Sequence, residues 1–170
     1  MGLFNYRILL ADEQFWQALF NTFHFRPLLL QLPLALLLAL IVNAPLLRGR
    51  HFFRLSFFSP TLVADIFVAI IFRQVYHPDS GLLNLTLGTQ ILWLENKYMI
   101  MPSIILTSAW KSVGFNMIYF LAGLQGIRRE LYEAAQVDGA GRWHSFVHIT
   151  LPSLRPITIF AVVISIIESL

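Results

Sequence analysis

The sequence has no cysteine and few charged residues. Without cysteine, this segment forms no disulfide and contains no thiolate metal site. Charged residues make up 12% of the chain and hydrophobic residues 57%, whereas an average soluble domain is about 25% charged. The apolar residues also fall in long runs and do not alternate with polar ones. Together these features indicate a membrane protein and argue against a chain that folds in water alone.

Two kinds of short motif are also missing. Residues 1–24 contain no basic segment followed by an apolar run, so no secretory signal peptide is predicted. No phosphate-binding loop and no nucleophile motif is found in the chain. We therefore expect no catalytic residue and no cofactor bound by this chain.

Four apolar stretches reach or approach the roughly 20 residues that a helix needs to cross about 30 Å of hydrocarbon. They cover about residues 25–43, 55–73, 99–124 and 157–170. The sequence therefore predicts an all-α fold, a polytopic transmembrane helical bundle over residues 25–170 with an external segment at 1–24. The fourth stretch is too short to cross fully, and we expect it to be a truncated span.

The placement of arginine and lysine predicts the orientation, because basic residues in short loops stay on the cytoplasmic side. The link after the first span contains Arg48, Arg50 and Arg54 and no acid. The link after the third span contains Arg128, Arg129, Arg142 and Arg155. Both links are predicted to be cytoplasmic, and the link between residues 73 and 97 external. The net charge of +3 is accounted for by this topology, so no nucleic-acid partner is expected.

The link between the third and fourth spans is the one polar stretch in the apolar second half of the chain. Good helix formers run over 128–137, and Gly139 follows an aspartate in a typical turn signal. A second short helix is expected from about 140 to 148. Pro152 and Pro156 then mark the entry to the next span. Such a polar bend between two spans is a docking site for a soluble partner.

This link also carries a motif with fixed spacing. Its positions are Glu133, Ala134, Ala135, Gly139, Ile149, Leu151 and Pro152. In order and spacing they resemble the EAA loop of permease subunits in ATP-driven, binding-protein-dependent importers. The likeness continues through 81–84 and 109–116, and residues 2–10 resemble the external segment that follows the first span of sugar-type permeases. We expect a fragment of a longer permease; a genuinely short protein is the alternative.

The resemblance implies the type I permease fold of ABC importers, with a cytoplasmic coupling-helix loop at 125–156. It implies a transport subunit that is not an enzyme, located in the cell inner (plasma) membrane among its lipids. The implied partners are a pair of ATP-binding subunits, which would bind and hydrolyse the ATP, a second permease subunit and an extracytoplasmic solute-binding protein. The implied substrate is a sugar or a related polyol.

The resemblance also assigns roles within the loop. The helix after Gly139 would insert into a groove on the ATP-binding subunit and move when that pair closes on ATP. Glu133 would anchor the loop through a basic or polar group of the permease or of the partner. Trp143 and Phe146, three apart on a helix, would be the apolar anchors of the interface. The alternative is an ordinary amphipathic surface helix with Trp143 at the membrane interface.

Polar residues inside the predicted spans are candidates for the translocation path. They are Asp65, Lys111, Asn116 and Tyr119. Asp65 and Lys111 are each near the middle of a span, where an ionisable group needs a partner or water. The alternative interpretation is that these two residues form a structural pair within the bundle. The sequence leaves both interpretations open.

An intramembrane hydrolase or peptidase is the alternative function, with Asp65, or His144 and His148, at its centre. The two histidines are four apart and share one face of a helix, as in some metal sites. However, a zinc-protease motif requires glutamate at position 145, where this chain has Ser145. No third ligand is evident, so two interfacial histidines and no metal are expected.

Overall fold

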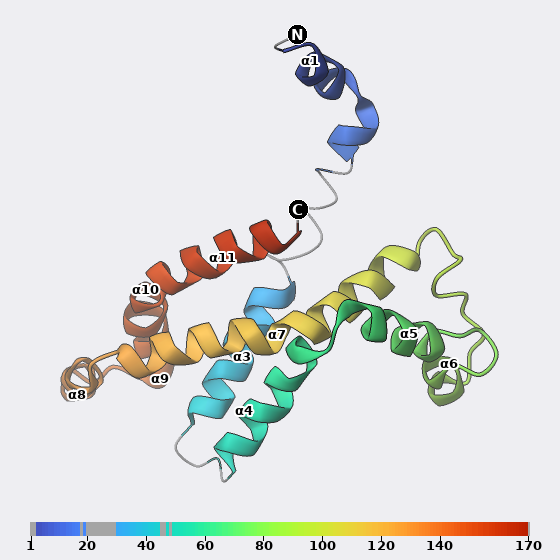
Figure 1. Ribbon diagram of the computed structural model, residues 1–170. Helices are drawn as coiled ribbons and strands as arrows, with labels where there is room; N and C mark the ends of the chain where they lie inside the picture. The colour runs from blue at the N-terminus through green and yellow to red at the C-terminus, as the bar shows by residue number, and fades with distance from the viewer. Residues whose placement is uncertain (1–2, 18, 20–29, 45–46, 48, 170) are drawn as a thin grey trace.

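A computed structural model describes residues 3–17, 19, 30–44, 47 and 49–169 of the chain. The described residues form helices and no strand, which confirms the all-α prediction (Figure 1). The elements are, in order, α1 Phe4–Ala11, α3 Leu32–Asn43, α4 Arg50–Phe58, the 3-10 turn η2 Ser59–Leu62, α5 Asp65–Val75, α6 Leu82–Leu87, α7 Ile100–Gly126, α8 Arg129–Val137, α9 Arg142–Ser145, the π-helical turn η3 Phe146–Thr150, α10 Leu151–Ser153 and α11 Arg155–Ser169.

Helix α7 is the axis against which α3, α4 and α11 pack. On α3, Ala35 and Ala39 are completely buried one turn apart, and such small side chains let two helix backbones approach closely. They pack in one cluster with Met117 and Phe120 of α7 and with Ala161 of α11. The remaining buried members of this core are Leu32, Val42, Val113, Leu121, Leu124 and Leu154.

The predicted second span, over 55–73, is wrong as a single helix. The helical segments 50–62 and 65–75 meet at a bend of 100°. Pro60 has no N–H to donate and lies in the 3-10 turn, after which Val63 and Ala64 are extended. Asp65, expected in mid-span, is therefore the first residue of α5 and lies at the break.

The helix after Gly139 also differs from the prediction. It begins at Arg142, not at about 140, and continues through the π-helical turn to Ser153. Pro152 does not end it, because the π-helical turn directly before it, in which the N–H of Leu151 donates to the carbonyl oxygen of Phe146, shifts the hydrogen bonds by one residue and accommodates the proline. The chain then bends by 59° into α11, where Pro156 again occupies the first turn.

Only one helix in the described part of the chain, α7, is long and apolar enough to cross a membrane by itself. Two more segments qualify if each bent pair is taken as one span, 50–62 with 65–75 and 142–153 with 155–167. α3 is a shorter apolar helix, and residues 25–29 of the first predicted span lie outside the described residues.

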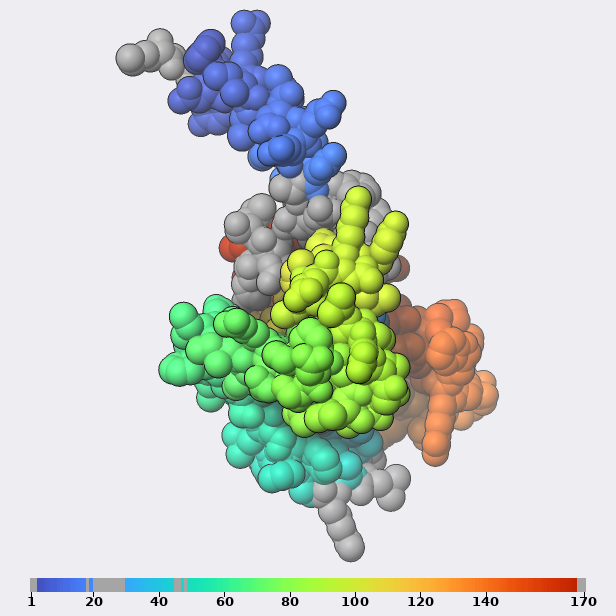
Figure 2. All heavy atoms as spheres, turned by 90° about the vertical axis from the view of Figure 1, so that its right-hand side faces the viewer, coloured from blue at the N-terminus to red at the C-terminus, as the bar shows by residue number. Residues whose placement is uncertain are grey.

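The link between α5 and α7 folds into a compact cap. The buried side chain of Asn84 donates hydrogen bonds to the carbonyl oxygens of Pro78 and Ile91, and it accepts one from the Trp93 indole at 2.8 Å. The hydroxyl of Tyr76 donates to the carbonyl oxygen of Ser103 at 2.9 Å. Figure 2 shows this segment covering one end of the bundle. In contrast, α1 has no buried residue and stands apart from the bundle.

Candidate functional site

The first candidate site is the bend between α8 and α9, at the end of α7 away from the cap (Figure 1). Gly139 has a φ of +76°, in the left-handed region that favours glycine. Its N–H donates to the carbonyl oxygen of Gln136, and the N–H of Ala140 donates to that of Ala135 at 2.8 Å. These two bonds form a Schellman motif, which ends a helix with a defined change of direction. The turn that the sequence predicts at Gly139 is therefore present in the structure.

The short helix after this bend presents apolar side chains at the surface. Trp143 is 75% exposed, and its ring lies 5.6 Å from that of Phe146, which is half-buried. Val137, at the end of α8, is 88% exposed. Between the two helices is a hollow of about 440 Å³. Large exposed apolar side chains beside a hollow are suited to contact with another protein.

The two sides of the bend are joined by a contact that sequence analysis did not identify. The hydroxyls of Tyr132 on α8 and Thr150 on η3 are 2.8 Å apart, and Thr150 is buried. The two residues are 18 positions apart, so no local sequence signal marks the pair. Glu133, one residue further along α8, is exposed and has no ion-pair partner among the described residues. Its carboxylate is available to a partner protein.

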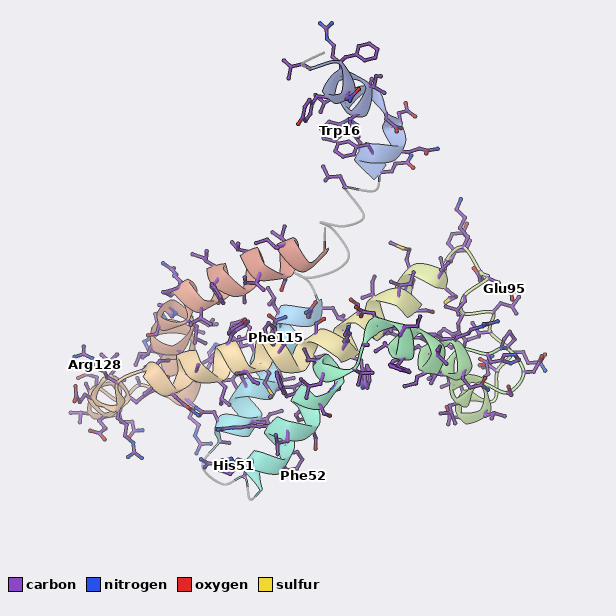
Figure 3. The ribbon with its side chains drawn as sticks, in the orientation of Figure 1. Trp16, His51, Phe52, Glu95, Phe115 and Arg128 are labelled. Atoms are coloured by element: carbon purple, nitrogen blue, oxygen red, sulfur yellow. The ribbon has the colours of Figure 1, made fainter. Side chains whose placement is uncertain are left out.

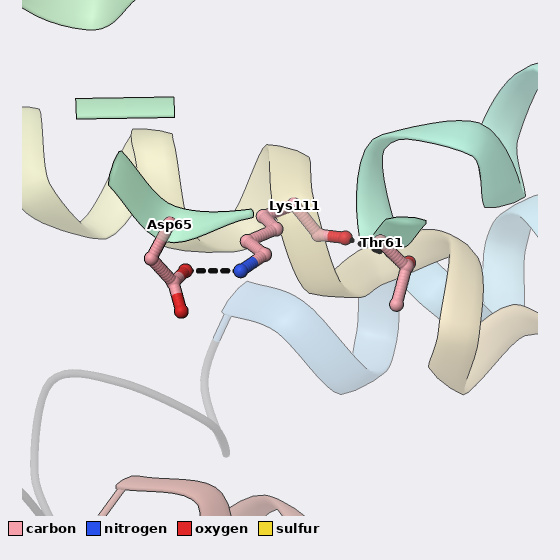
Figure 4. A network of polar contacts seen from close by, with 3 residues as sticks. All are labelled: Thr61, Asp65 and Lys111. Atoms are coloured by element: carbon pink, nitrogen blue, oxygen red, sulfur yellow. Dashed lines mark hydrogen bonds and ion pairs between the residues drawn. The ribbon is translucent and has the colours of Figure 1, made fainter. Parts of the chain in front are cut away.

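The second candidate site is at the break between η2 and α5 (Figure 4). The carboxylate of Asp65 forms an ion pair with the ammonium group of Lys111 on α7. Thr61, which was not identified from the sequence, donates a hydrogen bond of 3.0 Å to the backbone carbonyl oxygen of Lys111. The break is therefore held to one residue of α7 by two polar contacts.

A cavity of about 320 Å³ opens beside this ion pair, between α5 and α7. Its polar and charged lining residues are Asp65, Arg73, Tyr76, Thr107, Ser108 and Lys111. The other two candidates are not in this lining. Asn116 is buried in the core with its amide lacking a hydrogen-bond partner in the described structure, and Tyr119 stacks edge-on against Phe115 and Phe160. Of the four path candidates, only Asp65 and Lys111 are brought together.

Residues 14–170 match a family model described as the binding-protein-dependent transport system inner membrane component. The chain belongs to this family. The membrane location and the permease fold predicted from the sequence are thereby confirmed.

The chain is similar to named permeases of other organisms. It is 40% identical over 175 residues to the arabinooligosaccharides transport system permease protein AraP of Bacillus subtilis, covering 98% of this chain and 55% of AraP. It is 37% identical over 169 residues to the lactose transport system permease protein LacF of Rhizobium radiobacter, covering 94% of this chain and 56% of LacF. The chain thus spans little more than half the length of these relatives.

The same similarity is found among solved structures. A chain in the crystal structure of a bacterial ABC transporter that imports the acidic polysaccharide alginate has a TM-score of 0.82 and 31% identity. The match covers 97% of this chain and 60% of that chain. A second structure, of the alginate transporter in complex with an alginate pentasaccharide-bound periplasmic protein, has a TM-score of 0.80 and 30% identity.

The histidine pair of this inner membrane component gives the hydrolase alternative no support. The rings of His144 and His148 are stacked with centroids 4.0 Å apart on an exposed face of the coupling-loop helix. In the described ranges, no group of three or more histidine, aspartate or glutamate side chains is placed to hold a metal. Asp65, the other proposed centre, is paired with Lys111. The relatives named above are permeases, and none is a hydrolase.

Proposed function

We propose that the chain forms the membrane-embedded substrate path of an ATP-driven importer and couples that path to separate ATP-binding subunits. One observation carries the proposal. The motif helix α8 ends in a left-handed turn followed by an exposed Trp143, and this bend lies at one end of α7, while the charged cavity lies near the other. A movement at the bend can therefore be transmitted to the cavity through one continuous helix, α7.

The proposed partners follow from this role. A pair of ATP-binding subunits would receive the bend around Gly139 and hold the ATP, so that this chain binds no cofactor and catalyses no reaction. A second permease subunit would complete the path, and an extracytoplasmic solute-binding protein would deliver the substrate. The similarity to an importer solved with a loaded periplasmic protein supports the last of these partners.

The proposed substrate is an oligosaccharide or a related polyol. The support is chemical as well as comparative. The cavity combines the aromatic ring of Phe72, packed edge-on against Trp110, with the hydroxyls of Thr107 and Ser108. Aromatic faces and hydroxyls together suit a sugar ring, which has both apolar faces and polar edges. The relatives named for arabinooligosaccharides and lactose agree with this class.

The central test uses the full-length subunit assembled with its ATP-binding subunits and second permease in proteoliposomes. Adding the cognate binding protein loaded with its sugar is expected to stimulate ATP hydrolysis and sugar uptake together. The unloaded binding protein is the control. Stimulation of neither activity by any loaded binding protein would refute the importer assignment.

The topology gives a separate prediction, because the chain is expected to be multi-pass in the inner membrane with its basic links inside. Single cysteines at the exposed positions of His51 and Arg142 should not react with an impermeant thiol reagent added to intact cells. A cysteine at exposed Lys97, in the predicted external link, should react. The absence of native cysteine gives a clean background. External labelling at either cytoplasmic position would contradict the proposed orientation.

The Asp65–Lys111 pair gives a prediction that separates its two possible roles. The Asp65 side chain is 89% exposed and that of Lys111 22%, so in water the pair would contribute at most about 1 kcal/mol. Removing one charge, as in Asp65→Asn, leaves the other unpaired and should lower the level of folded subunit. Exchanging the charges, as in Asp65→Lys with Lys111→Asp, should restore that level.

Transport by the exchanged variant then identifies the role. If the pair lines the substrate path, the variant is present at normal levels but its uptake remains low, because the charges that face the substrate are reversed. Normal uptake by the exchanged variant would show that the pair is structural only. Membrane levels measured by immunoblotting and uptake measured with labelled sugar provide both readouts.

A further inference from the structure

Helix α4 has its charged and apolar residues on unexpected sides. Arg50, Arg54 and Phe57 are spaced four and three apart, so they share one face, and Phe57 packs against the core. Both arginines are half-buried on this inner face. The outer face instead presents Phe52, 70% exposed, and Leu55, 68% exposed. Two apolar side chains of α4, Phe52 (labelled in Figure 3) and Leu55, thus lie on the exposed face, while its two arginines share the face of Phe57.

The inward-facing arginines have no counter-ion in the described structure. The sequence contains no acid between residues 43 and 64. The ion pairs among the described residues join Lys111 to Asp65 and Arg128 to Glu130, and neither involves α4. The Nε atom of Arg54 is buried without a hydrogen-bond acceptor. Two half-buried guanidinium groups without a counter-ion favour the binding of an anion.

The start of α4 adds to the local positive potential. The helix begins at Arg50 with no acidic residue in its first turn and no side-chain hydrogen bond to its first N–H groups. Uncapped N–H groups at a helix start favour an anion. The anion-attracting groups of this segment are therefore the two guanidinium groups, reinforced by the helix end.

We propose that Arg50 and Arg54 bind the phosphate of an anionic phospholipid from the cytoplasmic leaflet, whose acyl chains lie along Phe52 and Leu55. Guanidinium groups bind phosphate in a bidentate manner, and basic pockets between membrane helices on the cytoplasmic side suit anionic head groups. The exposed apolar face of the same helix favours a lipid over a soluble phosphate, because it gives the acyl chains a surface. The predicted cytoplasmic position of the link places the arginines at the anionic leaflet.

The test uses the complete transporter reconstituted in nanodiscs with phosphatidylcholine and phosphatidylglycerol. Native mass spectrometry of the released complex should show phosphatidylglycerol retained in preference to phosphatidylcholine. Because each basic group near the surface contributes about fivefold in affinity, the double variant Arg50→Gln with Arg54→Gln should lose about 25-fold in that preference. The matched control is Arg7→Gln, since Arg7 is an exposed arginine on α1, away from the bundle.

Other outcomes identify a different occupant. Equal retention of the two lipids by the wild-type complex would overturn the proposal without any variant. Displacement of the retained lipid by millimolar inorganic phosphate would point to a free anion site and also overturn it. Loss of the ATP-binding subunits from the double variant, with lipid retention unchanged, would assign the arginines to a protein interface. If the glutamine variant does not fold, Arg50→Lys with Arg54→Lys should keep the charge and show an intermediate preference.

Discussion

Replacing Gly114 with alanine is expected to prevent stable packing of α4 against α7. A Cβ at this position would overlap the backbone carbonyl group of Phe57 and lie 3.0 Å from the amide nitrogen of Phe58. These are backbone atoms, so no rotamer change relieves the overlap and the two helices must separate. Overpacking usually destabilises by about 1–3 kcal/mol, and a backbone clash should exceed that range. Thermal unfolding of the purified full-length subunit measures the effect.

Two other glycines of α7 provide graded controls. At Gly123 an added Cβ would meet the side-chain carbons of Leu154 and Ile157 at 2.8 and 2.9 Å, and side chains can shift. At Gly126 nothing lies within 4 Å of an added Cβ, and alanine favours the helix over glycine by up to about 1 kcal/mol. Stability should therefore fall most for Gly114→Ala, less for Gly123→Ala, and not at all for Gly126→Ala. Equal melting temperatures for all three variants would contradict the close contact at Gly114.

Replacing Gly139 with valine is expected to slow sugar uptake and substrate-stimulated ATP hydrolysis together. A non-glycine residue at a φ of +76° is strained by roughly 1–2 kcal/mol, and 1.4 kcal/mol on a barrier is about tenfold in rate. Sugar uptake and substrate-stimulated ATP hydrolysis should fall together by about tenfold, while membrane insertion and binding-protein docking stay normal. Paired assays in proteoliposomes with the complete complex measure both activities.

The neighbouring Gly141 is a matched control for this change. Neither glycine would bring an added Cβ within 4 Å of another atom, but Gly141 has an ordinary φ of −71°. Gly141→Val should therefore transport nearly normally. Gly139→Asn should also keep much of the activity, because asparagine tolerates left-handed angles. Normal transport by Gly139→Val, at a normal subunit level, would contradict the coupling role and favour the alternative, an ordinary surface helix.

Glu133→Ala tests the same coupling through charge. Its exposed carboxylate has no ion-pair partner in the described part of the chain, so a contact with the ATP-binding subunit is its expected use. Losing a charged hydrogen bond of about 1.5–3 kcal/mol should weaken copurification of that subunit and lower both activities. Glu130→Ala, on the same helix, is the control. It removes an exposed carboxylate that forms a surface ion pair with Arg128 at 4.0 Å, and such exposed pairs contribute little, so the change should have little effect. Unchanged copurification in Glu133→Ala would contradict the anchoring role.

Local sequence signals predicted several elements closely. The expected helix at 128–137 is α8 at 129–137, the turn falls at Gly139, and the apolar stretch at 99–124 corresponds to α7 at 100–126. Each of these depends on neighbouring residues: helix formers in a row, a glycine after an aspartate, or a long apolar run whose one proline, Pro102, lies in the first turn. Such signals survive folding because their interactions lie within one or two helical turns.

The break within 55–73 was not predictable in the same way. Val63 and Ala64 adopt extended angles although both are apolar, so hydropathy continues unchanged across the bend. The bend is held by Thr61, whose bond to Lys111 joins residues 50 positions apart, and by Asp65, whose partner is 46 positions away. The sequence supplied both members of the ion pair as candidates but not the bend that brings them together.

The sequence by itself determined the membrane environment, the helical class and the position of the coupling turn, because composition, hydropathy and a left-handed glycine act locally. Only the tertiary structure decided that Asp65 is at a helix start beside Lys111, that Asn116 is excluded from the cavity, and that the arginines of α4 face inward. These features depend on which helix faces pack together. Packing joins residues far apart in the chain, and the close approach at Gly114 fixes it where a single methyl group would not fit.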